Sequence, residues 1–297
     1  MTRKVWWTAV LAAIAALAST IVACGGGDNG GATAGPSGTQ ATGSGAAIAG
    51  VVLTQADAET FMRSVADDYN TSNADGFLGK FTDQGLAAFL GDSVTPPSDL
   101  RTQARNFIGS GAQINVQGVE GFSSADGKTT FYLTSIQGNT VEREQFVLVQ
   151  QNGQTLVDGY TKVAPNVPPG VASLSVGATE AKYDFDASKV TSGNIAFVLT
   201  NNGTQHHEMV LTKVDAGPSL TDLEASAAAA TNSSNLPSGF EELIGSVSAA
   251  PSQSATMVFA QPLGSGRYAF FDFTPDANDP NGQTFASEGM AAEFTVQ

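Results

Sequence analysis

The sequence of 297 residues predicts an α+β domain followed by an all-β Greek-key sandwich. Three observations predict this order. Apolar residues recur at helical spacing between residues 54 and 108, and they alternate with polar residues from residue 113 onward. A Pro-rich segment at 165–170 interrupts the alternating pattern. The short strands that follow it, separated by turn residues, are typical of a β-sandwich.

The first 24 residues carry a targeting signal. Arg3 and Lys4 precede an apolar, Ala-rich run at 5–22, which leads through Ala23 to Cys24. This segment resembles a bacterial lipoprotein signal peptide. The resemblance implies cleavage before Cys24, attachment of lipid with palmitate-type acyl chains, and an anchor on the extracytoplasmic face of the cell membrane. An uncleaved membrane-spanning anchor is the alternative, because the run is just long enough to cross a bilayer.

Composition limits the function classes. Cys24 is the only cysteine, so the folded part has no thiolate for catalysis or metal binding. Acidic residues outnumber basic ones 28 to 13, which disfavours nucleic acid as a partner. The expected partners are the membrane, through the lipid on Cys24, and an unknown envelope protein or small ligand. We expect a signal peptide at 1–23, a disordered Gly/Ser-rich tether at 24–50, and domains at 51–165 and 166–297.

The first domain is expected to begin with helices. Thr54 and Asp57 resemble a capping box at the start of the first helix, and further helices are expected at 75–89 and 98–108. Four strands follow, and Asn152-Gly153 predicts the last hairpin. The other expected turns are Asp126-Gly127 and Gly138-Asn139, between apolar runs near 114–119, 131–133, 146–148 and 156–160. Helices followed by a curling antiparallel sheet resemble the NTF2-like (SnoaL-like, cystatin-like) superfamily in layout.

The NTF2-like resemblance implies a conical pocket between the helices and the sheet. Candidate acid or base residues there follow from position alone, and carboxylates are more often solvated surface groups. A small-molecule enzyme predicts a closed pocket containing a carboxylate with a raised pKa, whereas a scaffold predicts a pocket filled by side chains. The positional candidates are Asp67, Asp68, Tyr69, Asp158 and Tyr160.

The second domain is expected to consist of short strands. An insert at 219–243, helical or irregular, separates two groups of them, and an Asn-rich turn at 201–203 precedes His207. An Asp/Asn loop at 276–282 is interpreted as a turn, not a calcium site, because it lacks the distal Glu and the flanking helices of an EF-hand. The expected strands are 172–176, 182–185, 195–200, 207–211, 254–259, 268–273 and 292–296.

Two segments of this domain, 190–211 and 266–296, resemble the cupredoxin family. Matched residue by residue, His207 takes the position of the first copper-binding His and Met290 that of the axial Met. Asp272 stands where the family has its Cys, and Phe285 where it has its second His. A type 1 copper site needs two imidazoles and a thiolate. The resemblance therefore implies a cupredoxin-like domain without that centre, and we expect no cofactor.

Metal binding remains open as an alternative. His207 with Asp272, or His206 with Glu208, could hold Cu(II) or Zn(II), because strand alternation sends His207 to one face and its two neighbours to the other. The competing interpretation is that His207 is a hydrogen-bonded remnant packed against Phe285 and other core residues, and that His206 is solvated.

The sequence predicts a membrane-tethered extracytoplasmic lipoprotein that acts as a non-enzymatic binding or scaffolding module. The first alternative is a copper- or metal-binding envelope protein that uses His207 and Met290. The second is an NTF2-like enzyme acting on a small molecule. The metal content of the protein distinguishes the first alternative from the prediction. A pocket that contains a carboxylate with a raised pKa, instead of one filled by side chains, distinguishes the second.

Overall fold

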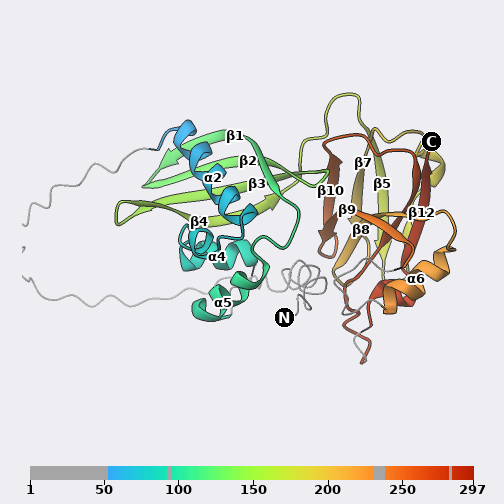
Figure 1. Ribbon diagram of the computed structural model, residues 1–297. Coiled ribbons are helices and arrows are strands. Elements are labelled where there is room, and N and C mark those ends of the chain that lie inside the picture. Colours follow the sequence, from blue (N-terminus) through green and yellow to red (C-terminus); the bar gives the residue numbers. More distant parts are fainter. Residues whose placement is uncertain (1–52, 92–94, 230–237, 281–282) are drawn as a thin grey trace, which may run out of the picture.

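The computed structural model describes residues 53–91, 95–229, 238–280 and 283–297 (Figure 1). The expected signal peptide, Cys24 and the tether lie outside these ranges. In the ranges described, we find no helix with the length and apolar character needed to cross a membrane. We refer to residues 53–165 as the N-terminal part and to 166–297 as the C-terminal part. The buried apolar residues form one cluster in the N-terminal part and two in the C-terminal part.

Four helices open the N-terminal part: α2 (Gln55–Asn70), α3 (Ala74–Leu78), α4 (Asp83–Leu90) and α5 (Pro97–Phe107). The capping box is confirmed, since the Asp57 N–H donates to Thr54 Oγ1 and the Thr54 N–H donates to Asp57 Oδ2. The single helix expected at 75–89 is wrong. Phe81 forms a β-bridge to Val157, and Thr82 then caps α4 by accepting from the Gly85 N–H.

Four antiparallel strands follow, and the helices cover one face of their sheet (Figure 1). The strands are β1 (Ile114–Ala125), β2 (Lys128–Gln137), β3 (Thr140–Gln151) and β4 (Gln154–Val163). All three expected turns connect them. Asp126-Gly127 and Asn152-Gly153 have positive φ at both residues, as a type I′ turn requires.

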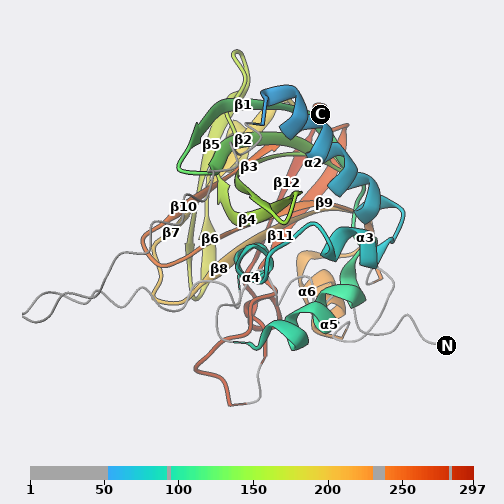
Figure 2. The ribbon, with the colours of Figure 1, turned by 90° about the vertical axis from the view of Figure 1, so that its left-hand side faces the viewer.

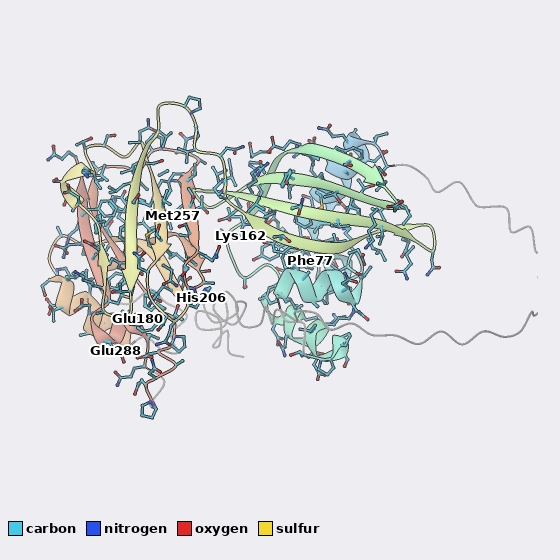
Figure 3. All side chains as sticks on the ribbon, turned by 180° about the vertical axis from the view of Figure 1, so that it is seen from behind. Phe77, Lys162, Glu180, His206, Met257 and Glu288 are labelled. Atoms are coloured by element: carbon cyan, nitrogen blue, oxygen red, sulfur yellow. The ribbon has the colours of Figure 1, made fainter. Side chains whose placement is uncertain are left out.

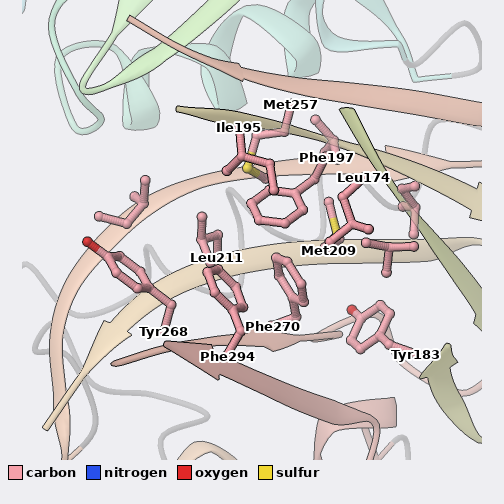
Figure 4. Packing of buried hydrophobic residues seen from close by; sticks show 14 of the residues in the cluster. Leu174, Tyr183, Ile195, Phe197, Met209, Leu211, Met257, Tyr268, Phe270 and Phe294 are labelled. Atoms are coloured by element: carbon pink, nitrogen blue, oxygen red, sulfur yellow. The ribbon is translucent and has the colours of Figure 1, made fainter. Parts of the chain in front are cut away.

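The C-terminal part is a sandwich of two sheets, as expected. One contains β5 (Ala172–Thr179), β6 (Lys182–Asp184), β7 (Ile195–Asn201) and β10 (Ser254–Phe259), with β5 parallel to β7. The other has the order β12 (Ala291–Val296), β11 (Gly266–Phe271), β8 (His207–Val214) and β9 (Phe240–Ala249). Rings and aliphatic chains from both sheets meet between them, including Phe197, Leu211, Phe270 and Phe294 (Figure 4).

Strand β9 is a feature that the sequence did not indicate. The expected insert contains α6 (Leu220–Ala229), but its end is already part of β9. The pairing of β9 with β8 shifts register between Leu211 and Thr212 and again between Lys213 and Val214. Such irregularities change which residues face the core, so the strand lacks a regular alternation of polar and apolar residues.

The two parts are joined by strand pairing as well as by the chain. Strand β10 pairs with the start of β3, with Val258 opposite Val141 and Phe259 opposite Thr140. Strand β4 pairs with β3 only from Arg143 onward, which leaves the start of β3 available to β10. The sheet of the N-terminal part therefore continues into one sheet of the sandwich (Figures 1 and 2).

Candidate functional site

The residues at the cupredoxin-like positions come together at one end of the sandwich. Strand β8 begins at His207, and its neighbour β11 ends directly before Asp272. His207 Nδ1 and Asp272 Oδ2 are hydrogen-bonded at 2.7 Å, and both side chains are 0% exposed. The other carboxylate oxygen of Asp272 accepts from the Thr274 N–H at 2.9 Å. The protein itself thus occupies both oxygens of this carboxylate.

Phe285 and Met290 lie at the same end of the sandwich. The short helix η3 (Phe285–Glu288) holds Phe285 with its ring centroid 4.7 Å from that of His207. Both Phe285 and Met290 are buried members of the sandwich core. The aromatic ring at the second-His position therefore packs against the imidazole and offers no donor atom.

The second ring nitrogen of His207 is enclosed. Nε2 has no hydrogen-bond partner within the described ranges, and it lies 4.0 Å from Glu180 Oε1. A Cβ at Gly203 would lie 2.8 Å from this nitrogen, so the loop backbone covers it closely. The Glu180 carboxylate accepts hydrogen bonds from the loop that contains Gly203. These bonds, foremost from the Thr204 backbone N–H and also from Gln205, lower the pKa of Glu180 to about 2.

This donor set does not fit a type 1 copper centre. One imidazole nitrogen is already bonded to Asp272, each oxygen of that carboxylate already has a hydrogen-bond partner, and a phenyl ring stands at the second-His position. In the part of the chain that the structure describes, no group of three or more His, Cys, Asp or Glu side chains is placed to hold a metal ion.

A second location offers more space. A cavity of about 630 Å³ lies where the two parts meet, and both contribute to its walls. The N-terminal part supplies mainly apolar and aromatic walls, including Phe77, Phe89 and Phe146, whereas the C-terminal part supplies polar residues such as His206 and Ser246. Lys162 and His206 both line this cavity, and Figure 3 shows them on facing sides of the junction.

Glu144 is the buried acid of this cavity. It lies on β3, is 7% exposed, and accepts a hydrogen bond of 3.1 Å from the Tyr160 hydroxyl on β4. Burial raises the pKa of Glu144 to about 7, and the charge of Glu142 adds to the rise. Glu142 is itself buried and forms an ion pair of 2.8 Å with Lys162.

His206 and Glu208 belong to the other side of the junction. Both ring nitrogens of His206 are enclosed without a hydrogen-bond partner in the ranges described, and burial lowers the pKa of this imidazole. The expectation that His206 is solvated is therefore wrong. Glu208 is 1% exposed, and Ser246 lies within hydrogen-bonding reach of its carboxylate. Burial raises the pKa of Glu208 well above its usual range, and Asp272 adds to the rise.

Of the positional acid–base candidates, Tyr69 and Tyr160 line the cavity and the three aspartates do not. Asp68 pairs with Lys80, Asp158 accepts from Thr82 and Lys128, and Asp67 is exposed. Glu144 was missed, although a signal was present. Glu142 and Glu144 share the alternation phase of Phe146 and Leu148, which places two acids on the buried face of β3.

The Asp/Asn loop bonds to its own backbone and to its neighbours. Asp276 Oδ1 accepts from the Asn278 N–H and from the Gln205 side chain, both at 2.7 Å. Asp279 Oδ2 accepts from the Gln283 N–H at 2.8 Å. Asn281 and Gly282 lie outside the described residues. These bonds are those expected of a turn.

No protein-family model matches this chain, and no curated protein matches it either. Among solved structures, it is similar to reduced auracyanin from Roseiflexus castenholzii, with 21% identity, 42% of this chain and 97% of that chain covered, and a TM-score of 0.28. Auracyanin B gives 14% identity, 45% and 94% coverage and a TM-score of 0.26. A multicopper oxidase from Pseudomonas thermotolerans gives 13% identity, 63% and 52% coverage and a TM-score of 0.23. TM-scores this low carry no argument about what the chain does.

Proposed function

We propose that this chain is a membrane-tethered, extracytoplasmic lipoprotein that binds a small molecule in the cavity between its two parts. The observation that carries the proposal is the cavity of about 630 Å³ with walls from both parts. Ligand pockets typically enclose about 300–1,000 Å³, with apolar walls and a few polar groups that fix orientation. A pure scaffold predicts a pocket filled by side chains, whereas this cavity leaves space for a ligand.

The sequence resemblances support the same proposal. Helices that precede an antiparallel sheet and enclose a cavity agree with an NTF2-like layout for 51–165. His207, Asp272, Phe285 and Met290 gather at one end of the sandwich, which supports a cupredoxin-like domain without a type 1 copper centre for 166–297.

The cavity is tested with a neutral, apolar fluorescent probe, N-phenyl-1-naphthylamine, titrated into the purified full-length chain. We expect saturable binding at one site. Ala88 lines the cavity on α4, so Ala88→Trp should occupy part of the space and weaken binding. Gln84 is exposed on the same helix, so Gln84→Trp is the matched control and should bind normally. Equal binding by both variants would contradict the proposal.

The tether is tested separately at Cys24, which the lipoprotein resemblance makes the lipidated residue. Cys24→Ser should remove the lipid and prevent the cleavage that depends on it. Mass spectrometry of the purified chain should show an acylated Cys24 in the wild type and an uncleaved leader in the variant. An unmodified, uncleaved wild-type chain would support the alternative of a membrane-spanning anchor.

Acid–base catalysis on the bound molecule is a second candidate function. Glu144 favours it, because a pKa of about 7 suits a general base near neutral pH, and its partner Tyr160 holds it in place. The test follows exchange of the α-hydrogens of 4-phenyl-2-butanone for deuterium in heavy water by NMR. Catalysis predicts exchange above the buffer rate that Glu144→Gln abolishes, and binding alone predicts the buffer rate in both proteins.

A further inference from the structure

We infer that the ligand of this cavity is an organic cation, an ammonium or guanidinium group on an apolar body, whose charge is received by Glu144. This inference rests on the proposed binding function and specifies its ligand class. Three observations support it. Buried acids outnumber buried bases at the junction, aromatic rings line the wall beside Glu144, and the basic side chains nearby are either ion-paired or favoured in the neutral form.

The buried charges at the junction are unequal. Glu142 and Glu144 are both buried there, and the cation that acts on them is Lys162. Lys162 is bonded to Glu142, and among the described residues no ion pair forms at Glu144. A buried carboxylate without a counter-charge is costly. A cation in the cavity would supply the missing positive charge next to Glu144.

The walls next to Glu144 are suited to a cation as well. The Tyr160 ring, whose hydroxyl bonds to Glu144, lies 5.0 Å from the Phe89 ring and 5.3 Å from the Phe146 ring, measured between centroids. All three line the cavity. Aromatic faces attract cations, and the attraction strengthens when the cation is desolvated. A carboxylate set among aromatic rings can therefore bind both the charge and the apolar body of one ligand.

An anionic ligand is disfavoured by the same groups. Lys162 lines the cavity, but its ammonium group is 2.8 Å from Glu142 and so already neutralised. His206 also lines the cavity, and burial lowers its pKa, which favours the neutral imidazole. An anion would add a further negative charge beside Glu142 and Glu144.

Cation binding should depend on pH. The titratable groups that act on Glu144 are Glu142 on its own strand and Tyr160 and Lys162 on β4, and Tyr69 on α2 and His206 before β8 also line the cavity. Since the pKa of Glu144 is raised to about 7, its ionised fraction falls about tenfold for each pH unit below 7. Affinity for a permanent cation should fall with it and level off above pH 7.

The test compares three probes of similar shape, 4-phenylbutylamine, 4-phenylbutanol and 4-phenylbutyrate, by isothermal titration calorimetry of the full-length chain at pH 8. We expect the amine to bind at least about tenfold more tightly than the alcohol, as one well-placed ion pair allows. Glu144→Gln should reduce the amine to the affinity of the alcohol and leave the alcohol unchanged. Glu120 is exposed on β1 and pairs with Arg143, so Glu120→Gln is the matched control and should alter neither.

The outcomes separate this inference from the proposed function. Equal affinity of amine and alcohol, or tightest binding of the butyrate, would overturn the cation while leaving the cavity a binding site. Binding of the neutral fluorescent probe without any preference for the amine would likewise overturn the cation and leave the cavity a binding site. Failure of every probe, the neutral one included, would overturn the proposed function itself. A thermal unfolding scan of Glu144→Gln confirms that the variant is folded before its affinity is interpreted.

Discussion

Two buried polar pairs, one in the sandwich and one at the cavity between the two parts, differ in the space around them. His207 and Asp272 lie at 0% exposure in the sandwich, and the carboxylate has a protein partner on each oxygen. Glu144 and Tyr160 are also bonded to each other, but both line a cavity. The first pair occupies positions with a family resemblance and has no room for a ligand, whereas the second pair has room and no recognisable motif. A ligand can reach the Glu144–Tyr160 pair but not the His207–Asp272 pair, although only the latter pair lies at positions that resemble a known family.

Removal of Asp272 should have the largest effect on stability. Asp272→Ala leaves His207 Nδ1 and the Thr274 N–H buried without a partner, and loss of one member of a buried pair costs about 3–5 kcal/mol. Urea unfolding measures the free energy of unfolding. Asp184, exposed on β6, gives the control Asp184→Ala, with a change within about 0.5 kcal/mol. A loss below about 1 kcal/mol for Asp272→Ala would mean that the pair is not structural.

Replacement of Glu144 in the cavity should raise the stability of the protein instead of lowering it. The folded-state pKa of Glu144, about 7, lies above the unfolded value of about 4.3. Between these values the folded state binds the extra proton, so the contribution of this group to stability is present below pH 4 and is lost as pH rises to 7. Glu144→Gln removes that loss and should be more stable than the wild type by up to about 4 kcal/mol at pH 8.

The measurement is urea unfolding of both proteins at pH 4.5 and pH 8. The difference between Glu144→Gln and the wild type should be small at the lower pH and appear only at the higher one. A variant that is less stable than the wild type at pH 8 would indicate that the ionised carboxylate is well paired in the fold.

The closed cover over His207 predicts a smaller effect. In Gly203→Ala the new Cβ would lie 2.8 Å from His207 Nε2 and 2.7 Å from Glu180 Oε1, and such overpacking costs about 1–3 kcal/mol. A methyl group at Gly217 would have no other atom within 4 Å, so Gly217→Ala should be neutral. Binding of the neutral probe should be the same in both variants. Weaker probe binding in Gly203→Ala would show that the loop over His207 affects the cavity.

The smallest expected effect is that of the His207→Ala substitution on copper binding. Titration of Cu(II) into the full-length chain, followed by EPR, should give no stoichiometric complex that His207→Ala removes, because the accessible donors around His207 are too few. Asp186→Ala, at an exposed acid, is the control for nonspecific binding. A one-to-one complex lost in His207→Ala would restore the metal-binding alternative.

Local features were predictable from the sequence. The cap at Thr54 and the turns at Asp126-Gly127 and Asn152-Gly153 depend on neighbouring residues alone. The break between α3 and α4 was not predictable, because it depends on a bridge from Phe81 to Val157, far along the chain. Glu144 was recognisable as a buried acid only by its alternation phase, and its cavity requires both parts in place.

The pairing of β10 with β3 has a mechanical consequence. It extends over only two register pairs, supported by side-chain bonds between Asn139 and the backbone of Gln261. Each such hydrogen bond contributes a net stabilisation of about 1 kcal/mol. The apolar cores on either side are separate clusters. A ligand that contacts both walls of the cavity would therefore add contacts across this short pairing and hold the two parts together.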